Sequence, residues 1–286
     1  MDVSITLSPA IKRVRDILQP VSQITLFRDP RINQILYLGF FLLYGLFYLG
    51  WQMDIQRIIL TISTCLLTQY VFARIYGKDM HSLKSAMITG LGMSLLFRSA
   101  EVFPVVLAAF LAISSKFLIT YKGKHFFNPG NFGIILGIIL TGKGWISPGQ
   151  WGNGTVLLVF LLITGLNVIL RVGRMDTSIV FLFSFAGLQY LYQVIYLGWP
   201  ADHFYHQFTS GTLLLYAFFM ITDPVTTPNA LKARIIWAFL TGVLAFILSK
   251  WFFIHTAPIW ALFFIAPLTV LLDIIFIDKR FKWTTS

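Results

Sequence analysis

The sequence predicts an all-α integral membrane protein of about ten transmembrane helices, arranged as two inverted five-helix repeats with short or broken helices. Of its 286 residues, 57% are hydrophobic and 12% are charged. A soluble globule has about 25% charged residues, so this chain has too little polar surface to cover one. Its apolar residues gather in runs close to the length that crosses a bilayer, and Lys and Arg fall between the runs.

Composition also limits the classes of function. The net charge of +11 could suit a nucleic-acid binder, but the basic residues stand singly or in small groups between apolar runs, which is typical of membrane loops. The single cysteine, Cys65, lies within an apolar run and provides no disulfide, iron–sulfur or Cys-rich metal site. The sequence contains no phosphate-binding loop, dinucleotide-binding glycine motif or nucleophile elbow. It therefore shows no complete active site, and we expect no nucleic-acid partner.

The first half begins with residues 1–34, which we interpret as a cytoplasmic segment containing an amphipathic surface helix around residues 11–18. The first repeat, residues 35–140, follows. The third and fifth of its spans are short, and the third contains Gly90 and Gly92. The five expected spans are residues 35–51, 59–76, 86–97, 103–119 and 128–140.

The second half repeats this layout. An outer connecting loop at residues 141–155 leads to a second repeat at residues 156–277 and a cytoplasmic tail at residues 278–286. The short glycine-containing span again comes third, and short spans at matching positions in two halves indicate a repeat fold with its site between the repeats. The expected spans are residues 156–170, 179–197, 211–221, 235–251 and 259–277.

The distribution of Lys and Arg predicts the orientation. When alternate loops are assigned to alternate sides, one side receives 18 basic residues and the other receives four, namely Arg57, Arg98, Lys143 and Lys250. The basic side is the cytoplasmic one, so both termini are expected in the cytoplasm. The proline-broken segments 126–131 and 223–228 are expected on that same side.

Segment 218–228, with the sequence FFMITDPVTTP, interrupts the apolar pattern of the second half. In one interpretation a short helix ends within the membrane at Asp223, and its free carbonyls and the carboxylate bind a cation or a polar cofactor. In the other, Asp223 is a loop residue that caps the next helix. The pattern leaves both open.

Segment 128–131, with the sequence NPGN, opens the fifth span. Asn and Pro are common at helix starts, so it can be an ordinary capped helix. Alternatively, the helix amino terminus and the carboxamides of Asn128 and Asn131 receive a ligand. Lys116 lies upstream, where it can neutralise that ligand or extend to the membrane interface.

Two further groups of polar residues are candidates. Asp273, near the end of the last apolar run, is a candidate intramembrane acid for ion handling. His203 and His206 have the spacing of metal ligands, but no third ligand is evident near them, so we predict no metal site.

Two blocks of sequence resemble a known family. The first combines AISSK at residues 112–116 with KHFFNPGNFG at residues 124–133, and the second combines SGT at residues 210–212 with AFFMITDPV at residues 217–225. Together they resemble the RnfD/NqrB family, which comprises the D subunit of the Rnf complex and the B subunit of the sodium-pumping NADH:quinone oxidoreductase.

This resemblance implies two inverted repeats, a flavin and electron transfer across the membrane coupled to cation movement. It implies a non-covalent site for FMN or riboflavin at Asn128, although His125 stands where the family usually has a second Asn. The acids implicated in cation handling match Asp223 and, more loosely, Asp273. The expected cofactor-binding residues are Asn128, Asn131, Lys116 and Thr222.

One sequence difference separates this chain from the ion-pumping members of that family. Their outer loop carries a Ser-Gly-Ala-Thr motif that binds FMN covalently, whereas residues 147–155 here read SPGQWGNGT. We therefore predict no covalent flavin, and the chain resembles a short, divergent branch of which some members are labelled enediyne biosynthesis protein.

The leading hypothesis is a flavin-associated electron-transfer subunit in the inner (plasma) membrane of the cell that works with other membrane and redox subunits of an Rnf/Nqr-like system. The alternative is a redox-free inverted-repeat transporter or channel, in which Asp223 lines the permeation path.

Overall fold

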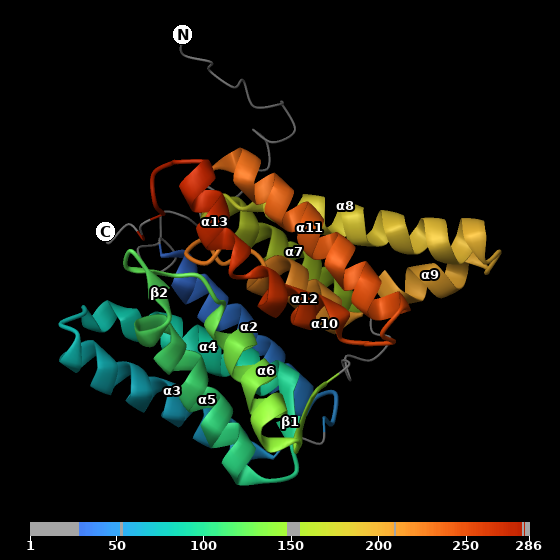
Figure 1. Ribbon diagram of the computed structural model, residues 1–286. Coiled ribbons are helices and arrows are strands. Elements are labelled where there is room, and N and C mark those ends of the chain that lie inside the picture. Colours follow the sequence, from blue (N-terminus) through green and yellow to red (C-terminus); the bar gives the residue numbers. More distant parts are fainter. Residues whose placement is uncertain (1–28, 52–53, 148–154, 209, 282, 284–286) are drawn as a thin grey trace, which may run out of the picture.

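The computed structural model describes residues 29–51, 54–147, 155–208, 210–281 and 283, and this part of the chain is mostly helical (Figure 1). The amphipathic helix expected around residues 11–18 lies outside the described residues. So do residues 148–154 of the connecting loop, on which the prediction of no covalent flavin depends.

Helices occupy the apolar segments of the first half. The first two begin four to five residues before the expected spans, because the side chains of Asp29 and Asp54 cap them by accepting a hydrogen bond from the backbone N–H two residues further on. A single 3₁₀ turn, η2 (Met80–Ser82), precedes the third. The helices are α2 (Pro30–Phe47), α3 (Ile55–Ile75), α4 (Leu83–Leu96), α5 (Val102–Leu118) and α6 (Pro129–Thr141).

Two short pairs of antiparallel strands lie in the connections that follow these helices. β1 (Phe97–Ser99) pairs with β4 (Gly144–Ile146), so the ends of α4 and α6 are held together. β2 (Thr120–Tyr121) pairs with β3 (Lys124–His125) through a tight turn in which Lys122 and Gly123 both have positive φ. Three residues separate the end of the β2–β3 hairpin from the start of α6.

The second half also forms helices at its apolar segments, with two differences from the sequence prediction. Helix α9 (Ala201–Phe208) occupies a stretch that was expected to be an outer loop. The expected last span forms two helices that are bent by 49° at a break around Pro267. The helices are α7 (Thr155–Val172), α8 (Met175–Tyr190), α9, α10 (Gly211–Leu215), α11 (Leu231–Lys250), α12 (Ala257–Ile265) and α13 (Leu268–Ile275).

Two helices of the second half continue as π-helix. α8 runs into η3 (Leu191–Tyr196), and α10 runs into η4 (Tyr216–Met220). Every residue of α10 and η4 is buried, so this short helix lies in the interior of the protein. π-helical turns are rare and are frequently found at functional sites. Here the π-helix ends directly before the segment that contains Asp223.

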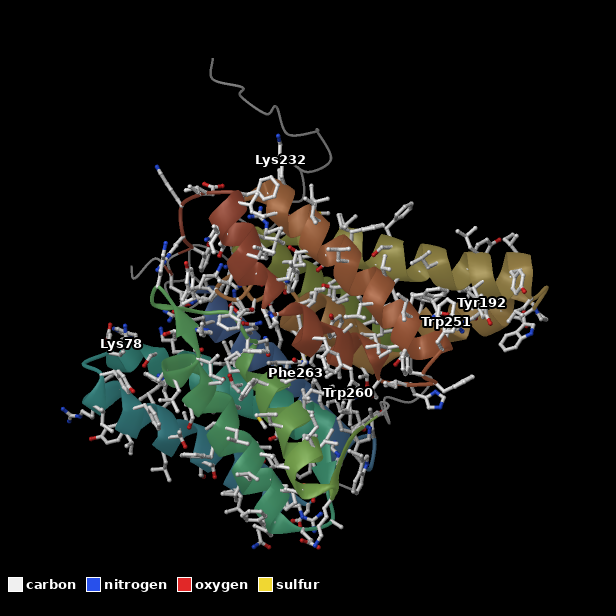
Figure 2. The ribbon with its side chains drawn as sticks, in the orientation of Figure 1. Lys78, Tyr192, Lys232, Trp251, Trp260 and Phe263 are labelled. Carbon is white, nitrogen blue, oxygen red and sulfur yellow. The ribbon has the colours of Figure 1, made fainter. Side chains whose placement is uncertain are left out.

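Several helix contacts of the first half have counterparts in the second. In the first half α3 packs on α4 and α5, α5 on α6, and α2 on α4; in the second, α8 packs on η4 and α11, α11 on α12, and α7 on α10 and η4. The halves meet where α2 contacts α7 and where α6 contacts α12 (Figure 1). On α12, Phe263 faces α6 and contacts the rings of Phe127 and Phe132 (Figure 2).

Small residues allow the closest helix contacts. A side chain at Gly133 would collide with the backbone of Ala108 on α5, and one at Gly165 on α7 would collide with the ring of Phe218 on η4. Close approach at small residues is the usual way in which helices associate inside a bilayer. The buried η4 helix therefore depends on Gly165 for its position.

Three of the described helices, α3, α8 with η3, and α11, are long and apolar enough to cross a membrane, and the bent pair α12–α13 counts as a fourth if it is one span. Large apolar side chains on these and neighbouring helices face outward, including Phe183, Leu67 and Ile163. Lys232 lies at the start of α11, and near the other end of this helix Trp251 and Tyr192 both contact the ring of Phe246 (Figure 2). Clusters of aromatic side chains are common at a membrane interface.

Candidate functional site

Asn128 caps helix α6 and also contacts the second half of the chain. Its side-chain oxygen accepts a hydrogen bond from the backbone N–H of Asn131 at 3.0 Å, as in an ordinary helix cap. Its amide nitrogen donates to the carbonyl oxygen of Met220 at 3.2 Å. Met220 is the last residue of η4, so the start of one helix is bonded to the end of another that lies about ninety residues away in sequence.

Asp223 lies in the turn that follows η4 and does not cap the next helix. Helix α11 begins only at Leu231, and its N-cap residue is Ala230. One carboxylate oxygen of Asp223 accepts from the backbone N–H of Val225 at 3.1 Å, and the Asp223 carbonyl oxygen accepts from the N–H groups of Thr226 and Thr227. The helix-cap interpretation of Asp223 is therefore wrong. The carboxylate stabilises a compact turn instead.

A cavity of about 100 Å³ lies between these two helix breaks. It brings together Asn128, Thr222 and Asp223 of the residues singled out in the sequence. Most of its wall is apolar and comes from α2, α4, α7 and η4, while Ser85 and Thr89 of α4 add hydroxyl groups. An apolar wall with a few polar groups is typical of small-molecule sites.

Lys116 reaches this cavity indirectly. Its ammonium group donates to the side-chain oxygen of Gln69 at 2.7 Å and to the hydroxyl of Ser85 at 3.1 Å, and Ser85 lines the cavity. The lysine is thus held by α3 and α4. Its charge also acts on the Asp223 carboxylate, together with the charges of Arg174 and Lys124. Three basic residues are thus within electrostatic range of Asp223.

Asn131 and Thr222 are both buried, but only Thr222 lines the cavity. The Asn131 amide nitrogen donates to the carbonyl oxygen of Ile259 at 2.7 Å, whereas its side-chain oxygen is buried without a hydrogen-bond partner. The Thr222 hydroxyl donates to the carbonyl oxygen of Phe218 at 2.7 Å, which leaves it free only to accept. A buried acceptor without a donor is costly, and no described residue supplies a donor to the Asn131 oxygen.

Asp273 does not line this cavity. It forms an ion pair with Lys124 at 2.7 Å and accepts from the backbone N–H of Asn229 at 2.8 Å. Lys124 also donates to the carbonyl oxygen of Thr227, so the pair joins the β2–β3 hairpin to the turn after Asp223. Burial lowers the pKa of Lys124, and the bond to Asp273 opposes this effect. The ion-handling role of Asp273 stays a prediction.

His125 stands in β3, three residues before Asn128, and its burial favours the neutral imidazole. Burial lowers its pKa to about 3, with repulsion from Lys116 and Lys124 adding to the effect. A neutral imidazole has one donor and one acceptor nitrogen, whereas the Asn expected there by resemblance has a carboxamide. The side chains of His203 and His206 lie outside the described residues. Within the described part, no three His, Cys, Asp or Glu side chains gather as a metal site requires.

Sequence reasoning missed three residues around the cavity. Arg31 and Trp283 line it, and Arg174 donates to the Thr227 hydroxyl at 3.1 Å and to the carbonyl oxygen of Pro224 at 3.3 Å. Burial lowers the pKa of Arg174 to about 10, and repulsion from Arg234 contributes. In the sequence Arg31 and Arg174 look like any basic loop residue, and nothing there indicates which loops meet.

The fold and site define a multi-pass helical membrane protein in which two interrupted helices share one interior cavity. The chain belongs to the NQR2, RnfD, RnfE family, whose sequence profile matches residues 140–282. The match includes Asp223 and Asp273 and ends before Trp283, while Asn128 and Lys116 precede it.

Individual relatives match a shorter stretch. The D subunit of the ion-translocating oxidoreductase complex of Vibrio vulnificus strain YJ016 is 30% identical over 111 residues, which are 39% of this chain and 29% of the relative. The protein of the same name from Erwinia tasmaniensis is 34% identical over 118 residues, 40% of this chain and 30% of the relative. That from Stutzerimonas stutzeri is 40% identical over 65 residues, 23% and 18% of the two chains. The matched stretch thus spans less than a third of each relative.

Proposed function

We propose that this protein is the electron-transferring membrane subunit of an ion-translocating oxidoreductase complex and that it holds a flavin, FMN or riboflavin, non-covalently between its two helix breaks. The bond from Asn128 to Met220 carries the proposal, because it brings both breaks to one cavity. The name of the relatives, a subunit of such a complex, supports the class of function. Other membrane and redox subunits would then deliver and remove the electrons.

The donor and acceptor groups around the cavity suit a flavin ring. Thr222 offers an acceptor and the Asn128 carboxamide lies in the cavity wall. Asn131, about one turn further along α6 and outside that wall, has an acceptor oxygen without a partner. Lys116 places a positive charge behind Ser85, where it would stabilise electron density on a bound ring. The flavin itself would supply the redox chemistry, while these side chains bind and orient it.

Asp223 is the proposed ion-handling residue. One of its carboxylate oxygens stabilises the turn, and three cations act on the group. Positive charges in the surroundings weaken the binding of a further cation. We therefore expect a coupling ion to pass Asp223 transiently rather than to be stored there, with Asp273 assisting from the loop beyond.

The proposed topology is ten spans in two inverted repeats with both termini in the cytoplasm of the inner membrane. Two observations support it: helix contacts in one half recur between the corresponding helices of the other, and the halves meet through corresponding helices, α2 with α7 and α6 with α12. The distribution of Lys and Arg supports the orientation.

The small volume of the cavity favours a second candidate. About 100 Å³ is below the roughly 300 Å³ of typical small-molecule pockets, so the site as it stands suits a small ion or solute. Under this alternative the protein is a redox-free transporter or channel that keeps the scaffold, and Asp223 lines its permeation path.

An absorption spectrum of the protein purified in mild detergent separates the two. We expect flavin bands at near-stoichiometric yield and release of the flavin by acid precipitation, and we expect Asn128→Ala to lose most of the flavin. Asn167→Ala serves as the matched control, because Asn167 accepts a hydrogen bond from Tyr37 away from this cavity. A well-folded but colourless protein refutes the flavin proposal and favours the transporter.

Ion handling has its own test. Asp223→Asn preserves the size of the side chain and is expected to abolish cation-dependent turnover in proteoliposomes while flavin content stays unchanged. Loss of flavin in Asp223→Asn, with cation dependence intact in whatever protein remains loaded, would instead assign Asp223 to the cofactor.

A further inference from the structure

The last described residues of the chain lie over the cavity between the helix breaks. Trp283 is part of the cavity wall, next to Arg31 of α2, and Asp223 and Pro224 belong to the same wall. The tail therefore returns to the site after leaving α13. Phe281 and Trp283 belong to no helix or strand, so they can be displaced without unwinding one.

Three contacts join this segment to the rest of the protein, and a fourth joins its two rings to each other. The Trp283 ring lies under the guanidinium of Arg31 at 5.1 Å, and the Phe281 ring lies under that of Arg174 at 5.6 Å. The two rings also meet edge to face at 4.9 Å. Before them, Arg280 donates a hydrogen bond to the carbonyl oxygen of Lys122 in the β2–β3 turn.

The two arginines are themselves fixed by other bonds. Arg31 forms a bidentate pair with Asp29, and Arg174 is bonded to the turn that follows Asp223. They thus form a rigid rim on which the aromatic rings rest. Contacts between a cation and an aromatic ring are individually weak, so the rings can leave the rim without disrupting it.

We propose that Trp283, which packs edge to face on Phe281, forms a removable cover over the cavity and that water-soluble molecules reach Asn128 and Asp223 from this side only when the cover is displaced. Trp283 is a positioning residue of the site: it closes the wall and limits the space to the volume observed. The proposal concerns access alone and holds whether the occupant is a flavin, an ion or a small solute.

Thiol labelling tests this inference without any cofactor. The chain has a single cysteine, Cys65, which is fully buried, so a cysteine introduced at a lining position is the only reactive one. Thr89 lines the cavity and is close to cysteine in size. The reporter is Thr89→Cys, and the probe is a small, positively charged methanethiosulfonate reagent applied to the full-length protein in detergent.

We expect slow labelling of the reporter protein and labelling about tenfold faster when Trp283→Ala is added, since loss of a contact between a cation and a ring makes the open state more populated. Trp283→Phe, which keeps a ring on Arg31, should label at close to the parent rate. Trp251→Ala is the matched control, because Trp251 is exposed next to the end of α11 and takes no part in the cavity wall.

A Trp283→Ala protein that keeps Thr89 contains only Cys65, and the labelling of Cys65 in it shows whether the bundle is still folded. Faster labelling at position 89 with Cys65 still protected supports the cover. An unchanged rate at position 89 overturns it. Faster labelling accompanied by reaction of Cys65 also overturns it, because the tail would then hold the bundle together rather than cover the cavity.

Discussion

The side-chain amide of Asn128 donates a hydrogen bond to the carbonyl oxygen of Met220 at 3.2 Å. Because the same carboxamide caps α6 through its oxygen, one residue fixes the start of that helix and attaches it to the end of η4. The two interruptions of the helical bundle are thus parts of one structure rather than separate irregularities.

Asn128→Ala should lower the free energy of unfolding by more than the loss of a helix cap alone would. Removing a cap costs about 1 kcal/mol, and the buried carbonyl of Met220 loses a donor as well. Asp54→Ala is the matched control, because Asp54 caps α3 and makes no bond to the other half. The midpoint of thermal unfolding in detergent should fall further for Asn128→Ala, and equal shifts would contradict the bridging role.

The ion pair between Lys124 and Asp273 should contribute strongly to stability. Both side chains are largely buried, at 9% and 13% exposure, so removing one partner strands a charge at a cost of about 3 kcal/mol. A double-mutant cycle with Lys124→Met and Asp273→Asn measures the coupling. The pair of Lys143 with Glu101 is more than half exposed on average and should couple by less than about 1 kcal/mol. Similar coupling energies would contradict this assignment.

Asp29 should make stability depend on pH in the acid range. Burial alone would raise the pKa of Asp29, but hydrogen bonds from Arg31 and Lys84 outweigh it and lower the pKa to about 2. Since the folded pKa lies below the unfolded value of 3.8, the stabilisation is complete above about pH 4 and is lost as the pH falls toward 2.

Asp29→Asn keeps a side chain able to cap α2 but removes the titrating group. Its unfolding midpoint should therefore change less between pH 5 and pH 3 than that of the parent, with both followed by thermal melts across that range. An identical pH dependence in the two proteins would show that another acid is responsible.

Two glycines on neighbouring helices should respond oppositely to the same change. A Cβ at Gly92 meets nothing within 4 Å, so Gly92→Ala should stabilise α4 by up to about 1 kcal/mol. A Cβ at Gly133 collides with Ala108 and Ala112 of α5, so Gly133→Ala should destabilise by about 1–3 kcal/mol. Thermal melts of the two proteins test this prediction. A lower melting temperature for Gly92→Ala would contradict it, because it would mean that other atoms occupy the space beside Gly92.

Gly92 also allows the cavity to be blocked from within. Gly92→Phe places a ring in the space between α4 and η4, so it should reduce the bound flavin severalfold relative to Gly92→Ala. The flavin content of the two purified proteins is the measurement. Equal content would place the cofactor elsewhere.

Much of the fold follows from the sequence because apolar runs of this length have few alternatives to helix in lipid. Helix α9 was missed because its sequence, ADHFYHQF, is polar and too short to register as a span. The break at Pro267 was missed because the apolar run continues through it and hides the bend.

The candidate site was predictable in part. The helix-breaking prolines and the distribution of basic residues placed Asn128 and Asp223 at one end of the protein, and the structure brings them to one cavity. The pairing of Lys124 with Asp273, 149 positions away, was not predictable, because periodicity says nothing about which loops meet. The same applies to the return of Trp283 to the cavity.

The bend between α12 and α13 separates two helices that contact different parts of the protein. Helix α12 is held against the first half by the ring contacts of Phe263, whereas α13 carries Asp273 and its tie to the hairpin. Since no continuous backbone ladder crosses Pro267, a shift of the hairpin that pulls on Asp273 need not be transmitted to the seam between the halves. The joint at Pro267 therefore allows the β2–β3 hairpin to shift with α13 while the seam between the halves stays fixed.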